Sequence, residues 1–83
     1  MKRIRNITEK ELEMLRREYP AGSRVELLEM DDKQAPPVGT EGTVLGVDDI
    51  GSIMVRWDTG SRLHVLYGVD RCRKLEGETG HEI

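Results

Sequence analysis

The sequence predicts a mainly β fold, in which one N-terminal α-helix precedes five short antiparallel strands that close into a small barrel. Three observations support this prediction. A capping-box pattern at Thr8 is followed by apolar residues at helical spacing, and this helical pattern ends before Pro20. After Pro20 the hydrophobic period changes from helical to alternating. Five short apolar runs separated by turn residues then occupy residues 20–75, a pattern typical of a barrel or a strongly bent pair of sheets.

The helix is expected to begin after Thr8 and to end before Pro20. Thr8 and Glu11 have the spacing of a capping box, in which each side chain accepts a hydrogen bond from the other residue's backbone amide. Pro20 stops the helix because the residue before a proline is disfavoured in the helical region. The apolar side chains of the helix fall on one narrow face: Leu12, Leu15 and Tyr19.

The five strands are expected at residues 24–30, 42–47, 52–57, 61–66 and 72–75. Their connections are a loop at 31–39, turns at 48–51 and 58–60, and one turn of helix at 67–70. This is the SH3-like order of parts, and closure suits a small chain because it removes exposed strand edges. Residues 1–19 form a basic segment with the amphipathic helix, and residues 76–83 form a flexible acidic tail.

The expected core is aliphatic, because the chain has no Phe and aromatic residues make up only 4% of it. The residues assigned to the core are Val25, Leu27, Val44, Ile53, Val55, Leu63, Val65 and Val69, joined by Leu12 and Leu15 of the helix. The lone Cys72 excludes an intramolecular disulfide and a zinc site built from several cysteines. No apolar stretch resembles a signal peptide or a membrane span, so an intracellular location is expected.

The charge distribution disfavours a dedicated DNA-binding role. Net charge is −3 and the pI is near 5.4, whereas duplex-DNA binders carry a basic face and a high pI. Residues 1–19 hold six basic and four acidic side chains, and residues 20–74 hold seven basic and nine acidic ones. Basic clusters at 2–5 and 71–74 still leave room for contact with a small anion.

Several segments together resemble a small domain family of unknown function that occurs in bacteriophages, plasmids and other mobile elements of Gram-positive bacteria. The matching segments are 19–27 (YPAGSRVEL), 30–32 (MDD), 35–40 (APPVGT), 42–44 (GTV), 46–49 (GVDD), 55–58 (VRWD), 60–61 (GS) and 68–71 (GVDR). The resemblance covers about residues 19–75 and implies no activity or site residues. The GTV and VRWD segments are also similar, more loosely, to KOW, Tudor and other SH3-like barrels.

Catalytic and metal-binding motifs are not expected. A nucleophilic Cys72 would need a base, and His64 and His81 are the only histidines; a small buried residue is the ordinary occupant of such a strand position. The acidic pairs at 31–32 and 48–49 are expected to cap turns instead of forming a carboxylate pair for hydrolysis. We therefore predict a non-enzymatic protein without a cofactor.

Six side chains around the third and fourth strands are candidate ligand-binding residues: Arg56, Trp57, Asp58, Arg62, His64 and Tyr67. Trp57 alternates with core positions, which favours burial, but a tryptophan at a barrel edge can instead stack on a ligand. Tyr67 has the same two interpretations. The cationic members can form a positive patch that suits phosphate or carboxylate, although polar side chains on the solvated face of a sheet need no ligand.

Three functions stay open on this basis. The first is a non-catalytic module of phage or mobile-element origin that recognises a protein partner through its loops and helix. The second is a counter-defence protein that sequesters a small signalling nucleotide or metabolite, with the helix stripe joining copies into a homo-oligomer. The third is a nucleic-acid accessory protein, which the acidic balance makes the weakest candidate. Convergence of Trp57, Tyr67 and Arg62 on one cavity would favour a ligand site; scatter would favour a protein-interaction surface.

Overall fold

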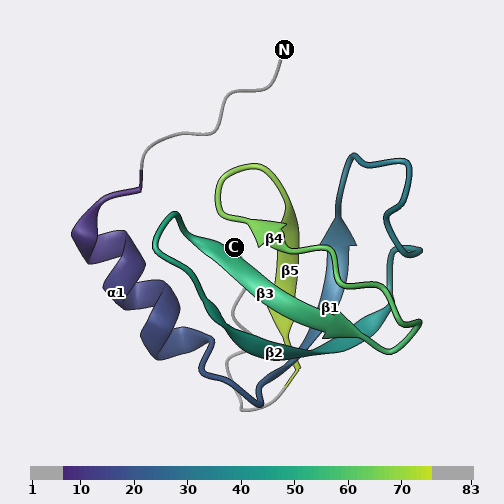
Figure 1. Cartoon of the computed structure of the whole chain (residues 1–83), viewed down its shortest axis with the longest axis horizontal. Helices are drawn as coiled ribbons and strands as arrows, with labels where there is room; N and C mark the ends of the chain where they lie inside the picture. Colours follow the sequence, from purple (N-terminus) through teal and green to yellow (C-terminus); the bar gives the residue numbers. More distant parts are fainter. Residues whose placement is uncertain (1–6, 76–83) are drawn as a thin grey trace.

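The computed structural model describes residues 7–75 as one helix and a single five-stranded antiparallel sheet (Figure 1). The elements are α1 (Glu9–Glu18), β1 (Arg24–Glu29), β2 (Glu41–Val47), β3 (Ser52–Trp57), β4 (Val65–Leu66) and β5 (Arg71–Lys74). The basic cluster at 2–5 and the acidic tail, with His81, lie outside the described residues.

The start and end of α1 confirm the helix prediction. The Thr8 hydroxyl accepts a hydrogen bond from the Glu11 amide at 3.1 Å, and the Glu11 carboxylate accepts one from the Thr8 amide at 3.0 Å. Tyr19 follows the last helical residue, and its amide donates to the Leu15 carbonyl. Leu15 and Tyr19 are buried, so the helix is fixed by its apolar face as well as by its cap.

The strands follow the order β4-β3-β2-β1-β5, with β4 and β5 at the two edges. No ladder joins β4 to β5 within residues 7–75, so the sheet is open and the predicted closed barrel is not found. The fourth strand is also shorter than predicted, because β4 contains only Val65 and Leu66. Residues 61–64 lie outside it, and the Leu63 carbonyl there accepts a hydrogen bond from the Trp57 indole N–H at 2.8 Å.

Two features bend the sheet. The pairing of β2 with β3 shifts register between Val44 and Gly46, and that of β1 with β5 shifts between Leu27 and Glu29. Such irregularities increase local twist and bend a strand. As Figure 1 shows, α1 then lies beside the turn between β2 and β3, while the loop after β1 projects from another part of the molecule.

The buried core consists of Leu15, Tyr19, Val25, Leu27, Val44, Ile53, Val55, Trp57, Val65 and Cys72. Seven of these were predicted. Leu12, Leu63 and Val69 were wrongly assigned to the core, because all three are only partly buried. Leu63 and Val69 instead open onto a surface pocket. Tyr19, Trp57 and Cys72 take their places, so aromatic rings supply volume that an aliphatic core would lack.

Candidate functional site

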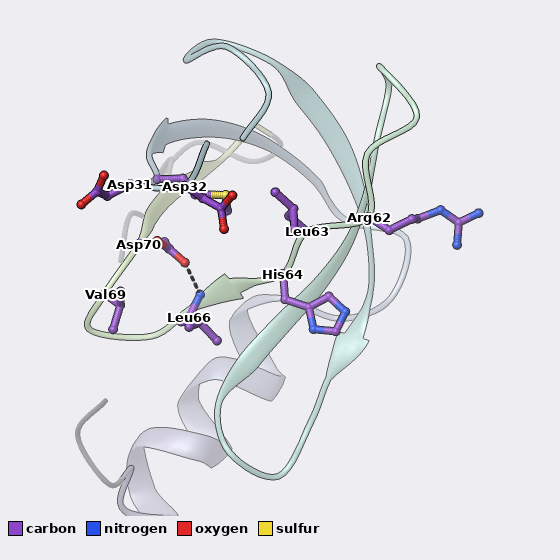
Figure 2. Close-up of a pocket in the computed structure, with 9 residues that line it drawn as sticks. Asp31, Asp32, Arg62, Leu63, His64, Leu66, Val69 and Asp70 are labelled. Carbon is purple, nitrogen blue, oxygen red and sulfur yellow. Dashed lines mark hydrogen bonds between the residues drawn. The ribbon is translucent and has the colours of Figure 1, made fainter. Parts of the chain in front are cut away.

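A pocket of about 420 Å³ lies where three separate segments meet: the loop after β1, the stretch from residue 62 to β4, and the turn before β5 (Figure 2). The residues that line it are Met30, Asp31, Asp32, Arg62, Leu63, His64, Leu66, Val69 and Asp70. The turn is held by the Leu66 carbonyl, which accepts hydrogen bonds from the amides of Val69 at 3.0 Å and Asp70 at 2.9 Å. The predicted helical turn at 67–70 is therefore a hydrogen-bonded turn that shapes one wall.

The apolar part of the pocket consists of Met30, Leu63, Leu66 and Val69. All four side chains are partly buried, which places them between the core and the solvent. An apolar surface of this kind favours contact with the hydrocarbon portion of a bound group.

The polar part of the pocket is dominated by carboxylates. Asp70 is only 7% exposed, and its Oδ2 accepts a hydrogen bond from the Leu66 amide at 3.0 Å, drawn as a dashed line in Figure 2. Asp32 is exposed, and its Oδ1 accepts a hydrogen bond from the Gln34 amide at 2.8 Å. Asp31 completes the acidic side. The acidic pair at 31–32 was predicted to cap a turn, and Asp32 does so while also lining the pocket; the corresponding role of Asp70 was not predicted.

Arg62 and His64 are the two predicted site residues that line this pocket. Both are exposed, and Figure 2 shows their side chains leading away from the aspartates. Because Asp31, Asp32 and Asp70 line the same pocket, Arg62 and His64 do not make it a uniformly positive patch.

The other four predicted site residues lie elsewhere. Trp57 is 1% exposed and packs in the core. Tyr67 is partly buried, and its hydroxyl donates to the Glu11 carboxylate of α1 at 3.4 Å. Arg56 is exposed on β3. Trp57, Tyr67 and Arg62 therefore do not converge on one cavity.

Asp58 belongs to an ion-pair network that crosses the sheet. The Arg24 guanidinium donates to its two carboxylate oxygens at 2.9 and 2.6 Å, a bidentate arrangement. Arg24 also donates to the Thr43 hydroxyl at 2.9 Å and to the Glu41 carboxylate at 3.3 Å. The hydrogen bonds from Arg24 hold the pKa of the Asp58 carboxyl below its ordinary value. This network explains Asp58 as a structural residue of the sheet surface.

Cys72 does not have the environment of a catalytic nucleophile. The residue is 0% exposed, and burial, reinforced by the negative charge of Asp70, raises the pKa of its thiol to about 12. A thiol nucleophile acts as its thiolate, which this environment disfavours.

The acidic pair at 48–49 acts as the sequence predicts, at least in its first member. The Asp48 carboxylate accepts hydrogen bonds from the amides of Ile50 at 3.1 Å and Ser52 at 2.8 Å, and so caps the turn between β2 and β3. Asp49 instead pairs with Arg16 of α1 at 2.8 Å. Within residues 7–75, no three His, Cys, Asp or Glu side chains are grouped so as to hold a metal ion.

In the same part of the chain, no helix has the length and apolar character needed to cross a membrane. No curated protein and no solved structure matches the sequence. A family match spans residues 8–75, and so includes α1, the whole sheet and every residue that lines the pocket. On this match, the chain belongs to the family described as "Domain of unknown function (DUF4314)".

Proposed function

We propose that this protein is a non-catalytic binding module that recognises a protein partner through the pocket between residues 30–32 and 62–70. The observation that carries the proposal is the pocket's mixed lining, in which apolar side chains lie beside carboxylates contributed by two distant segments. A side chain that protrudes from a partner can fill such a hollow, and a central pocket filled by an anchor residue often dominates the energy of a protein interface.

The lining also separates this proposal from the two alternatives. A signalling nucleotide or a nucleic acid would bring phosphate next to Asp32 and Asp70, and like charges at close range are unfavourable. Arg62 and His64 are the pocket residues that could offset this repulsion, but their side chains lead away from the aspartates (Figure 2). Sequestration of an anion and nucleic-acid binding are therefore less well supported than recognition of a protein.

The helix has a smaller part in this proposal than the sequence suggests. Leu15 and Tyr19 of the apolar stripe are buried against the chain's own sheet. The stripe therefore gives no reason for a homo-oligomer, and the contact surface is assigned to the loops and the pocket.

An SH3-like classification and a phage or mobile-element origin belong to the same proposal. The order of strands, the long loop between β1 and β2, and the turn before β5 support an SH3-like arrangement whose sheet remains open. The proposed origin depends on the family resemblance of residues 19–75, and it implies action in the cytoplasm of a bacterial host cell. A non-catalytic role fits the buried Cys72 and the structural use of Asp48.

Selection from a displayed library of random peptides tests the proposed function without knowledge of the partner. Val69→Arg fills the pocket with a bulky cation, whereas Ile50→Arg introduces the same side chain at a 63% exposed turn residue outside the pocket. We expect enriched peptides to bind the unmodified protein and Ile50→Arg equally, and to lose binding to a folded Val69→Arg variant.

Two results would contradict the proposed function. One is the absence of any enriched peptide, and the other is binding that survives in folded Val69→Arg. A thermal-shift panel of cyclic and linear nucleotides, run beside the selection, tests the sequestration alternative, because a tight ligand stabilises the native state by mass action. A large shift with a nucleotide would replace the proposed function with that alternative.

A further inference from the structure

We infer that the pocket receives a lysine or arginine side chain of the partner, with Asp70 as its principal acceptor. This inference rests on the proposed function and specifies its chemistry. It starts from Asp70, which is 7% exposed and belongs to the turn that forms one wall.

Asp70 retains an unused acceptor. Its Oδ2 accepts the hydrogen bond from the Leu66 amide, and its Oδ1 has no hydrogen-bond partner among the described residues. No buried side-chain oxygen in that part of the chain lacks a partner, so Oδ1 is reached by solvent. Asp70 lines the pocket, and in this inference its solvent-reached Oδ1 accepts the hydrogen bond of a donor that enters there.

Asp70 also lacks a cation. Within residues 7–75, no Lys, Arg or His lies within ion-pair distance of its carboxylate. A largely buried carboxylate is unfavourable unless it is paired or well hydrogen-bonded. A cation delivered by a partner would satisfy the free oxygen and compensate the charge, and such charge-assisted hydrogen bonds are stronger than neutral ones.

The apolar residues of the pocket suit the methylene stem of a Lys or Arg side chain. Leu63, Leu66 and Val69 provide apolar surface for the methylene stem, which Lys and Arg characteristically bury while the charged end meets polar groups. Asp32 adds a second carboxylate on the segment that follows β1. A bare divalent ion is a poorer match, because the described acidic side chains are not grouped for metal binding.

Titration with n-butylguanidinium chloride, followed by backbone amide NMR, tests this chemistry directly. The probe carries the cation and part of the alkyl stem of arginine, and n-butylurea is its nearly isosteric neutral control. We expect saturable shifts centred on the amides of Leu66, Val69 and Asp70. The neutral control should bind about fivefold more weakly or produce no saturable shift.

Matched variants locate the charge that matters. Asp70→Asn keeps an oxygen that can accept from the Leu66 amide but removes the negative charge, and we expect it to weaken probe binding about fivefold. Asp49→Asn removes the same charge from a 95% exposed side chain beside α1, and should leave binding unchanged. If Asp70→Asn does not fold, Asp32→Asn provides the test, since an amide oxygen can also accept from Gln34.

The results overturn the inference if the neutral probe binds as tightly as the cation, if the shifts do not saturate, or if Asp49→Asn weakens binding as much as the pocket variants do. Peptide selection separates this failure from that of the proposed function. Selected peptides that depend on the pocket but contain no common Lys or Arg would leave the binding module intact and exclude the basic side chain as its ligand.

Discussion

Trp57 is the single tryptophan of the chain and a core residue, so its fluorescence reports on the native packing. The residue is 1% exposed, and its indole N–H donates to the Leu63 carbonyl. We expect blue-shifted emission that acrylamide quenches only weakly in the native protein and strongly in urea. Efficient quenching of the native emission would show that the ring is accessible, as the stacking interpretation of Trp57 requires.

The buried thiol of Cys72 gives a prediction for alkaline pH. Its pKa is raised from the ordinary 9.0 to about 12 in the folded protein, so the unfolded chain releases this proton first as pH rises. The protonated Cys72 thiol therefore contributes to the free energy of unfolding, and this contribution is fully present below pH 9.0 and is lost between pH 9.0 and about 12. The slope expected from this residue is at most about 1.4 kcal/mol per pH unit.

Urea unfolding of the unmodified protein and of Cys72→Ala across this range measures that slope. Cys72→Ala is expected to be less stable at pH 7, because it leaves a cavity, but its stability should fall less steeply above pH 9.0. All other ionisable groups are the same in both proteins, so the difference between the two curves isolates the thiol. Parallel curves would contradict the assignment of a raised pKa to Cys72.

Within the sheet, Gly42 of β2 occupies a place where a side chain has no room. A Cβ there would lie 2.7 Å from Val55 Cγ1, 2.8 Å from Trp57 Cε3 and 3.0 Å from the Arg56 carbonyl oxygen. We expect Gly42→Ala to lower the free energy of unfolding by about 1–3 kcal/mol, the ordinary penalty for overpacking. A loss of stability would be informative, because replacing Gly by Ala at an unstrained position with room for the methyl group stabilises a protein by restricting its unfolded state.

Gly60→Ala is the matched comparison for Gly42→Ala. Gly60 has a positive φ of 99° and nothing within 4 Å of an added Cβ, so its replacement meets backbone strain alone. That strain is about 1 kcal/mol. Chemical denaturation should give Gly42→Ala a lower free energy of unfolding than Gly60→Ala. The reverse order would show that β2 can move away from β3 to admit a methyl group.

The predictions for individual elements succeed where local chemistry decides the structure. The capping box of α1, the stop at Pro20 and the alternation of β3 depend on neighbouring residues, and the structure confirms all three. The alternation of residues 61–66 predicted a full strand, but only Val65 and Leu66 join β3. Sequence periodicity does not reveal that the Leu63 carbonyl accepts its hydrogen bond from a side chain instead of a strand.

The pocket was also not predictable from sequence periodicity, because its residues come from segments that are far apart in the sequence. Arg62 and His64 line the pocket together because they lie two residues apart on one segment. Asp31, Asp32 and Asp70 come from loops that only the pairing of β1 with β5 brings together. No spacing in the sequence marks that juxtaposition, so a pocket whose lining combines carboxylates with apolar side chains could not be predicted from the sequence.

Considered as a whole, the molecule buries its helix and sheet in one common core. Leu15 and Tyr19 of α1 belong to the same buried cluster as Val25, Val44 and Trp57. Polar contacts reinforce this docking, because Arg16 donates to the Val47 carbonyl at 3.4 Å and to Asp49 at 2.8 Å. A chain with so few aromatic residues thus uses its helix to complete the core, and unfolding of α1 and of the sheet should be coupled.

Leu15→Ala tests this coupling, because Leu15 is fully buried and its truncation leaves a cavity between helix and sheet. We expect a loss of about 2–5 kcal/mol in the free energy of unfolding. Far-ultraviolet circular dichroism follows the helix and Trp57 fluorescence follows the sheet, and the two signals should keep a single shared midpoint in urea. Glu13→Ala, at an exposed position on α1, controls for the change in helix propensity and should alter stability little. Separate midpoints in Leu15→Ala, with helix loss preceding sheet unfolding, would show instead that the sheet forms an independent unit to which α1 merely docks.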